Sequence, residues 1–409
     1  MVLPGPRRKP RRRARAKPLN LRYTRHPMHV ISTTDQLAET CRILAAHDFV
    51  AVDTEFLREQ TFWPQLCLVQ LAGPGHEAIV DPQSKGLSLD PLWELMGNER
   101  VVKVFHAARQ DVEIVWAQGR LIPTPIFDTQ VAAMVCGFGD SVSYGNLVKK
   151  ITGRDIDKSS RFTDWSRRPL SEKQLVYALG DVTYLRDVYR HLKAELDRTR
   201  REHWLASEMA TLSDPATYET HPDEAWKRLK LRVKSRKALA VLMELAAWRE
   251  RLAQSQDVPR GRIMRDEALF DIANQMPTAP EQLAQLRTLS DGFSRSSRAK
   301  DIVEAVKRGL ARDLKDVPPL RQGEPLSAEA TATLELLKVL LKAAAAKHGV
   351  APRLIADGSE LELIASLDEP DVPAMHDWRR EIFGADAEAL KRGKLALTLE
   401  KGEVAVKRL

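Results

Sequence analysis

Two carboxylates follow an apolar run of strand length early in the chain. The run is Phe49–Val52 (FVAV), and Asp53 and Glu55 come after it. Because alternate side chains share one face of a strand, the two carboxylates point the same way. Neighbouring buried carboxylates repel each other unless a cation lies between them, so the pair could hold a metal ion. The same spacing occurs at ordinary solvated strand ends, and the rest of the chain must decide between the two interpretations.

Three further residues have the chemistry that such a site needs. Asp111 falls in the first turns of a predicted helix, close to the carboxyl end of a strand at residues 101–105, so it can face the acidic pair. Tyr177 and Asp181 are four residues apart, which places them on one face of a predicted helix. Taken alone, Asp111 could be a helix cap, and the Tyr177–Asp181 pair could be a local surface contact.

A mixed α/β region has to position these residues. Three apolar runs with short connections predict an antiparallel meander. A helix-length connection before strand 101–105 permits that strand to run parallel in the same sheet. Gly180, a poor helix former, is expected where another segment approaches the helix backbone closely. The meander runs are residues 49–56, 66–72 and 78–81, and the predicted helices are 34–46, 90–97, 106–119 and 171–192.

After about residue 200 the strand signals vanish, and helices are predicted almost to the end of the chain. The chain also resembles itself at an offset of 92 residues, which aligns Leu242 with Leu334 and Ile272 with Ile364. Two copies imply two small helical bundles, each with its own core. A Pro-rich segment at residues 317–325 separates them.

Charge is unevenly distributed along the 409 residues, whose formal net charge is +8. Residues 7–17 (RRKPRRRARAK) contain eight basic residues and no acid, so the remainder of the chain is balanced. This Pro/Arg-rich arm has too little apolar content to fold. It could bind phosphates non-specifically, or it could reflect an extended translation start, with Met28 as the first residue of the protein.

The composition excludes several other classes of protein. No apolar run approaches the roughly 20 residues needed to cross a bilayer, and the N-terminus lacks the apolar region of a secretory signal. Cys41, Cys67 and Cys136 are too few and too scattered for a disulfide framework or a zinc site. We therefore expect a cytoplasmic protein that acts without a membrane.

Three segments resemble the exonuclease motifs of the DEDDy class. They are VDTEF (52–56), FHAARQDVEIV (105–115) and YALGD (177–181). Further segments are similar to ribonuclease D in particular: IFDTQVAA (126–133), DKSSRFTDW (157–165) and RRPLSEKQLVYALGDVTYL (167–185). The two helical copies resemble the helicase-and-RNase-D C-terminal (HRDC) domain, the first more closely than the second.

The resemblance implies a fold and a domain order. The expected fold is an α/β ribonuclease H-like exonuclease domain, with a mixed sheet flanked by helices, followed by two all-α HRDC helical bundles. The expected division is a disordered basic arm at 1–27, the exonuclease domain at 28–212, a linker with a basic helix at 213–234, the first HRDC domain at 235–316 and an HRDC-like domain at 326–409.

The resemblance also implies a two-metal-ion hydrolysis of phosphodiester bonds. Asp53, Glu55, Asp111 and Asp181 would hold two divalent ions, with Asp53 bridging them. Hard oxygen ligands favour Mg²⁺ or Mn²⁺, and two such ions can activate water and neutralise charge on the phosphate. Tyr177 would orient the attacking water. With an ordinary pKa of about 10 it is a poor base at neutral pH, so the metal must lower the pKa of the water.

Other residues are weaker candidates for substrate binding. Phe56 could stack against the terminal base, or it could be a core aromatic residue. His106 could contact the substrate, although a structural histidine is also consistent with the pattern. Lys158, Arg161 and Trp165 lie in a polar loop, where a cation and an aromatic ring suit a single-stranded end. Trp165 could instead close the core.

The implied activity is 3′→5′ removal of nucleoside 5′-monophosphates from tRNA precursors and other structured RNAs with single-stranded 3′ ends. Residues 227–237 (KRLKLRVKSRK) contain seven basic residues and no acid, and could follow phosphates or form a solvated helix face. We hypothesise that the helical bundles form a wall with the catalytic domain and admit only flexible 3′ ends. We expect the protein to act as a monomer.

Two other functions remain open at this point. A 3′→5′ DNA exonuclease of the Werner or proofreading type would use the same metal site, since that site alone does not distinguish ribose from deoxyribose. The paired C-terminal copies favour RNA. An inactive binding protein is the third possibility, but such a protein has no physical reason to keep four mutually repelling acids.

Overall fold

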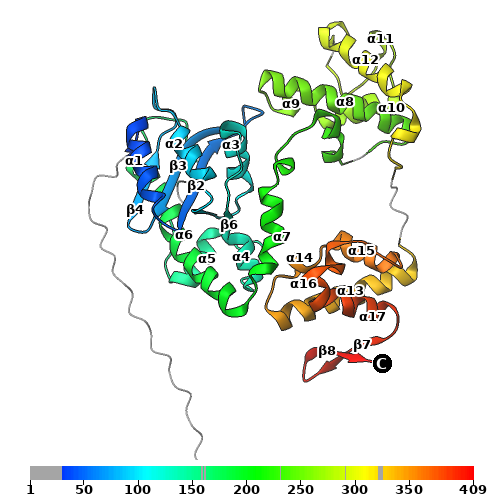
Figure 1. Cartoon of the computed structure of the whole chain (residues 1–409). Coiled ribbons are helices and arrows are strands. Elements are labelled where there is room, and N and C mark those ends of the chain that lie inside the picture. The colour runs from blue at the N-terminus through cyan, green and yellow to red at the C-terminus, as the bar shows by residue number, and fades with distance from the viewer. Residues whose placement is uncertain (1–29, 158–159, 161–162, 231, 291, 321–325) are drawn as a thin grey trace, which may run out of the picture.

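The computed structural model describes residues 30–157, 160, 163–230, 232–290, 292–320 and 326–409 (Figure 1). The basic arm, Met28, Lys158 and Arg161 lie outside these residues. Figure 1 shows an N-terminal α/β unit followed by two helical bundles. The predicted order of a mixed α/β region and then a helical region is therefore confirmed.

Within the described residues, six strands form one sheet in the order β1-β4-β3-β2-β5-β6. β2 pairs antiparallel with β3, and β3 with β4, which confirms the predicted meander. β5 runs parallel to β2, so the sheet is mixed, as predicted. β6 was not predicted, because a strand of three residues is too short to show a period. The strands are β1 (Val30–Ile31), β2 (Phe49–Leu57), β3 (Gln65–Gly73), β4 (His76–Val80), β5 (Val102–Phe105) and β6 (Ile126–Asp128).

Helices cover both faces of the sheet. On one face α1, α2 and α3 pack against Val50 and Val52. On the other face α4, α5 and α6 pack against Phe49 and Ala51. Because side chains alternate along β2, Asp53 and Glu55 point to the face that α6 covers. The helices are α1 (Thr34–Leu44), α2 (Asp90–Gly97), α3 (Arg109–Gly119), α4 (Thr129–Val135), α5 (Tyr144–Thr152) and α6 (Glu172–Thr199).

Helix α6 begins where the sequence predicts it. The Ser171 hydroxyl accepts from the backbone N–H of Gln174, and the Gln174 side chain accepts from the backbone N–H of Ser171, forming the predicted capping box. Buried Val182 and Leu185 anchor the helix on the sheet. After Arg200, which has a left-handed backbone, α7 (Glu202–Ser213) continues towards the helical bundles.

The first bundle, residues 222–317, is built around α8 (Arg236–Gln256) and has a core of its own. α12 packs so closely along α8 that a Cβ at Gly309 would lie only 2.5 Å from the Cα of Val241. Glycine at this position therefore permits the close contact. The other elements are α9 (Arg260–Ile263), α10 (Asp266–Gln275), α11 (Pro280–Leu283), α12 (Ser297–Ala311) and the 3₁₀ turns η2 (Pro222–Arg228), η3 (Phe293–Arg295) and η4 (Leu314–Asp316). The 3₁₀ turn η1 (Pro215–Thr217) lies between α7 and the bundle.

The C-terminal bundle, residues 328–408, repeats the start of the first one. α13, α14 and α15 begin 92 residues after α8, α9 and α10, which confirms the predicted repeat. The copies then diverge into short helices. The elements are α13 (Ala328–His348), α14 (Pro352–Ile355), α15 (Gly358–Ser366), the 3₁₀ turn η5 (Pro373–Met375), α16 (Asp377–Arg379), the π-helical η6 (Arg380–Gly384) and α17 (Ala385–Lys391).

The prediction that this second bundle is entirely helical was wrong. It ends in an antiparallel hairpin of β7 (Leu395–Glu400) and β8 (Glu403–Arg408). Lys401 and Gly402 form the turn with φ of 53° and 87°. Two successive residues of positive φ match the right-handed twist of the flanking strands. Apolar and other residues alternate in LALTLE and EVAVKR, which is the pattern of a strand, but the two segments are short and partly charged.

The prediction that each bundle has its own core was also wrong for the C-terminal bundle. Its buried residues form one continuous cluster with the helices of the N-terminal α/β unit. Trp204 of α7 stacks on Trp378 with ring centroids 4.5 Å apart. The Arg379 guanidinium, which is buried, lies 2.6 Å from the Glu208 carboxylate. These contacts fix the C-terminal bundle on the α/β unit.

The first bundle contacts the α/β unit through the loop between β2 and β3. The Asp257 carboxylate accepts the backbone N–H groups of Phe62 and Trp63, each at 3.0 Å. The Phe62 ring packs against the bundle beside Ile263, and the Arg260 guanidinium lies 4.4 Å above that ring. We call this contact the loop clasp. It connects the first bundle directly to the strand that carries Asp53 and Glu55.

No helix of the part of the chain that the structure describes is both long and apolar enough to cross a membrane.

Candidate active site

The structure brings Asp53, Glu55 and Asp181 together. Each offers a carboxylate oxygen, and these atoms lie within 4.8 Å of one another. Asp53 and Glu55 come from β2 and Asp181 from α6, so the cluster forms where the helix crosses the sheet. All three side chains are partly buried. We call these three residues the acidic cluster.

Burial and mutual repulsion raise the pKa values of the acidic cluster. The pKa of Glu55 is raised to about 9, by burial first and then by the charges of Asp53 and Asp181. Burial raises the pKa of Asp181 to about 7, although a hydrogen bond with Tyr177 lowers it. Burial and the charge of Asp181 hold the pKa of Asp53 well above its usual range. An all-oxygen donor set of this kind fits a hard divalent cation, which would relieve the repulsion.

Asp111 lies next to the acidic cluster but is held differently. Its carboxylate accepts a hydrogen bond of 2.5 Å from the Thr54 hydroxyl, and its side chain is buried. Burial and then the charge of Asp53 raise its pKa well above the usual range. Thr54 lies between Asp53 and Glu55 in sequence, so it points to the opposite face of β2. Sequence reasoning missed Thr54, because its role depends on where α3 packs.

Tyr177 faces the acidic cluster from α6. A hydrogen bond joins its side chain to that of Asp181, one turn further along the helix. Its ring centroid lies 6.0 Å from that of Trp165. Trp165 is 2% exposed and packs in a small apolar cluster with Leu68, so here its ring fills the core, which agrees with the second of its two interpretations.

The other candidate residues do not belong to the acidic cluster. His106 follows β5, and its Nδ1 lies 3.0 Å from the Thr129 hydroxyl. Burial lowers its pKa, which favours a neutral ring. Phe56 is partly buried and packs against the core on the α3 side of the sheet. Lys158 lies outside the described residues.

Tyr144 is a neighbour of the site that sequence reasoning missed. Its hydroxyl donates to the backbone carbonyl of Gly180 at 3.0 Å, and its ring lies 5.5 Å from that of His106. Burial and the charges of Asp181 and Asp53 raise its pKa. The expectation that another segment approaches the helix backbone closely at Gly180 was wrong. A Cβ added to Gly180 would meet no neighbouring atom within 4 Å.

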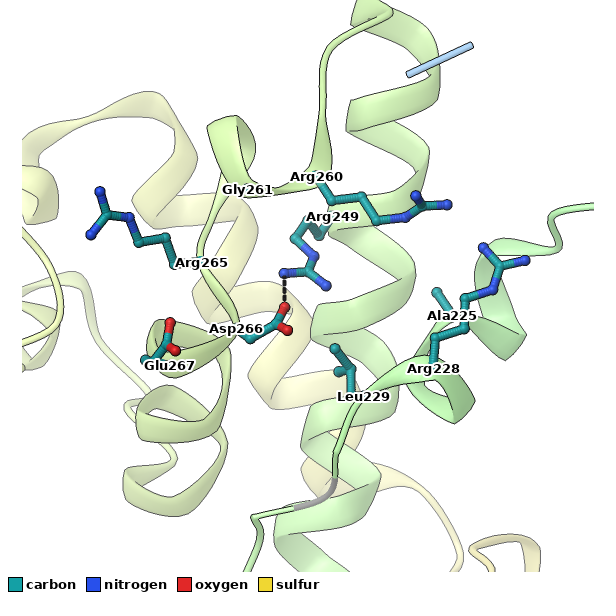
Figure 2. Close-up of a pocket in the computed structure, with 9 residues that line it drawn as sticks. All are labelled: Ala225, Arg228, Leu229, Arg249, Arg260, Gly261, Arg265, Asp266 and Glu267. Carbon is teal, nitrogen blue, oxygen red and sulfur yellow. Dashed lines mark hydrogen bonds and ion pairs between the residues drawn. The ribbon is translucent and has the colours of Figure 1, made fainter. Parts of the chain in front are cut away.

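A second polar site lies on the first bundle, far along the chain from the acidic cluster. Figure 2 shows a pocket of about 460 Å³ lined by four arginines. In Figure 2 the side chains of Arg249 and Asp266 point toward each other, and the Arg249 guanidinium lies 2.6 Å from the Asp266 carboxylate. Arg260 makes two hydrogen bonds of 2.5 and 2.6 Å to the buried Glu250, which Arg228 approaches at 3.5 Å. Arg228 belongs to the basic run of residues 227–237. We call this the arginine pocket.

Family models match the α/β unit and the first helical bundle of the chain. Residues 28–197 match the family model for the 3′-5′ exonuclease, and residues 238–306 match the HRDC domain. Ribonuclease D of Nitrobacter hamburgensis is 53% identical over 377 residues, which cover 92% of this chain and 98% of that protein. Ribonuclease D of Bartonella henselae is 48% identical and covers 96% of this chain and 97% of that protein.

A solved structure extends the comparison to the fold. The crystal structure of Escherichia coli RNase D, described as an exoribonuclease involved in structured RNA processing, matches with a TM-score of 0.76 at 27% identity. The match covers 90% of this chain and 99% of that chain, so it includes both helical bundles. These likenesses favour RNA over DNA as the substrate. The chain belongs to the ribonuclease D family and is a 3′→5′ exoribonuclease with an HRDC domain.

Proposed function

We propose that Asp53, Glu55, Asp111 and Asp181 hold two divalent ions, Mg²⁺ or Mn²⁺, and that the protein hydrolyses the terminal phosphodiester bond of RNA there. The observation that carries this proposal is the meeting of three carboxylates from two elements within 4.8 Å. When bound, the ions supply an activated water and neutralise charge at the scissile phosphate. Nucleoside 5′-monophosphates are the products.

The protein's own residues orient this reaction. Asp53, whose repulsion with Asp181 needs a cation to offset it, would be a ligand of these ions. Thr54 holds Asp111 so that its carboxylate stays at the edge of the acidic cluster. Tyr177, whose side chain is hydrogen-bonded to Asp181, would orient the attacking water. Because a tyrosine keeps its proton at neutral pH, Tyr177 positions the water rather than deprotonating it.

The substrates that we propose are tRNA precursors and other structured RNAs with single-stranded 3′ ends. The relationship to Escherichia coli RNase D supports this substrate class. Arg265 lines the arginine pocket and is exposed, so its guanidinium can contact a backbone phosphate of a folded RNA. In this arrangement the bundles form a wall beside the catalytic domain, and a flexible 3′ end reaches the acidic cluster.

The domain division at 28–212, 213–234, 235–316 and 326–409 is part of this proposal. The second module is HRDC-like, and its support is the shared spacing of its first three helices with those of the first module. The free cysteines fit a reducing cytoplasm. We propose that the protein acts there as a monomer, which light scattering of the purified chain tests.

A time course with 5′-labelled RNA tests the activity. The substrates are a tRNA with a 3′ extension and a DNA strand of matched sequence, each incubated in Mg²⁺ and in EDTA. We expect a ladder that shortens by single nucleotides on RNA and disappears in EDTA. Asp181→Asn should bind the RNA but produce no ladder. Equal trimming of DNA would count against RNA specificity, and trimming that survives EDTA would exclude the metal mechanism.

A further inference from the structure

The side chain of Gln70 is buried without a hydrogen-bond partner. Gln70 lies in the middle of β3 and is 0% exposed. Neither its amide nitrogen nor its amide oxygen has a hydrogen-bond partner among the described residues. Leaving a buried polar group unpaired costs about 1–3 kcal/mol. A glutamine in this position therefore needs a functional or structural reason.

The register of the sheet places this amide beside the acidic cluster. Gln70 pairs directly with Asp53 across the antiparallel β2–β3 ladder. Side chains of directly opposed residues lie on the same face, with Cβ atoms about 4.5–5.5 Å apart. Gln70 therefore points to the face of the sheet that α6 covers, where Asp181 approaches Asp53.

The apolar neighbours of Gln70 on this face cannot be its partner. Ile79 lies opposite on β4, and Leu68 and Ala72 are two residues away on β3; all three are buried. Of the polar side chains of the sheet on this face, Asp53 lies directly opposite Gln70, whereas Glu55 and Glu77 are diagonal neighbours. Glu77 is already paired with an arginine of α6. Asp53 is therefore the nearest polar partner that the sheet offers.

We propose that Gln70 is a positioning residue for Asp53. When the acidic cluster binds divalent ions, the Gln70 amide N–H would donate to the Asp53 carboxylate and hold it in the orientation that binds them. This inference rests on the proposed metal site. It assigns Gln70 no contact with the RNA.

The chemistry explains why the residue is a glutamine. An amide donates a hydrogen bond to a carboxylate without a charge, so it leaves the full negative charge available to the cations. A lysine or arginine would pair with Asp53 and compete with the metal. A leucine of similar volume would fill the space but supply no donor. Groups that orient metal ligands in this way typically change metal affinity about 10–100-fold when they are removed.

The test compares Mn²⁺ binding and unfolding of the full chain. Gln70→Leu and Gln70→Met remove the amide and keep the volume, and Gln65→Leu, at the exposed start of the same strand, is the control. Mn²⁺ affinity is measured by isothermal titration calorimetry, and the melting temperature is measured in EDTA. We expect about 10–100-fold weaker Mn²⁺ binding for both Gln70 variants. Their melting temperature in EDTA should be unchanged or higher, because an unpaired amide has been replaced by an apolar group.

The other outcomes overturn the proposal. Unchanged Mn²⁺ affinity in either Gln70 variant excludes a positioning role. A lower melting temperature in EDTA with unchanged Mn²⁺ affinity makes Gln70 a packing residue. Asp53→Asn is measured in parallel: if it also leaves Mn²⁺ binding unchanged, the metal site itself is wrong. If Asp53→Asn loses Mn²⁺ and the Gln70 variants do not, only the role of Gln70 is wrong.

Discussion

Without cations, the acidic cluster opposes folding as the pH rises. Glu55 has an ordinary pKa of 4.5 that is raised to about 9, and Asp181 one of 3.8 that is raised to about 7. The folded chain therefore keeps protons that the unfolded chain releases. The stability contributed by these groups is fully present below their unfolded pKa values and is lost as the pH rises through about 7 and then about 9. A bound divalent ion would remove this penalty.

The first prediction concerns the pH dependence of metal-free stability. In EDTA the melting temperature should fall as the pH rises from about 5 to about 9, and Glu55→Gln should reduce the slope because its amide does not titrate. Differential scanning fluorimetry measures both. Glu59→Gln, an exposed residue of the following loop, should keep the slope of the unchanged chain. Identical slopes for Glu55→Gln and Glu59→Gln would contradict the raised pKa of Glu55.

The second prediction separates Tyr177 from the metal ligands. Tyr177→Phe should lower kcat on single-stranded RNA by about 10²- to 10⁴-fold, because the water loses its orienting hydroxyl. Mn²⁺ affinity should stay unchanged, since the phenol is not a ligand. Tyr189→Phe, on the same helix but packed against Phe49, is the control. A loss of Mn²⁺ affinity in Tyr177→Phe, or normal turnover, would refute this role.

Part of the site could be predicted from sequence, because the relative positions of those residues follow from their spacing within one strand or one helix. Asp53 and Glu55 follow from strand alternation, and Tyr177 and Asp181 follow from helical spacing. Gln70, Thr54 and Tyr144 could not be found in this way. Their positions depend on strand register and on which helices pack on the sheet, and these are non-local properties.

Elements of strong periodicity were predictable for the same reason. β2, β3 and β4 are apolar runs with short turns, and α8 and α13 share a register at an offset of 92 residues. The strands β6, β7 and β8 are too short for their alternation of apolar and polar residues to be distinguished from a chance pattern. The docking of the C-terminal bundle left no local signal, because Trp204 and Trp378 are far apart in sequence.

The third prediction concerns the docking of this bundle through α7. Trp378→Ala should lower the free energy of unfolding by about 3–5 kcal/mol, since it removes a buried aromatic ring that stacks on Trp204. Urea denaturation followed by circular dichroism measures the change. Leu367→Ala, in the same bundle but 46% exposed, should change little. Equal effects of the two substitutions would show that the stack does not hold the bundle.

At the scale of the whole molecule, the catalytic unit contacts both bundles, but in different ways. The C-terminal bundle shares a continuous core with it. The first bundle, which carries the arginine pocket, contacts it through the loop clasp. A small contact of this kind can open more easily than a shared core. If RNA binds the first bundle, as we propose, we expect the loop clasp to couple that binding to the strand of the acidic cluster.

The fourth prediction follows from this coupling. Asp257→Ala removes the acceptor for two backbone N–H groups and should loosen the first bundle. The rate of trimming a 3′-extended tRNA should fall several-fold, while a short unstructured oligonucleotide, which reaches the acidic cluster alone, should be trimmed at the normal rate. Asp301→Ala, on the exposed side of α12, should affect neither rate. Equal losses on both substrates for Asp257→Ala would contradict the coupling.

The most direct test of the metal site is the anomalous diffraction of crystals of the full chain soaked in Mn²⁺. The account predicts two anomalous peaks about 3.5–4 Å apart. They should be bounded by Asp53, Glu55, Asp111 and Asp181, with Asp53 between the two ions. A map with no peak at the acidic cluster, from crystals of a preparation that trims RNA in Mn²⁺, would contradict the account.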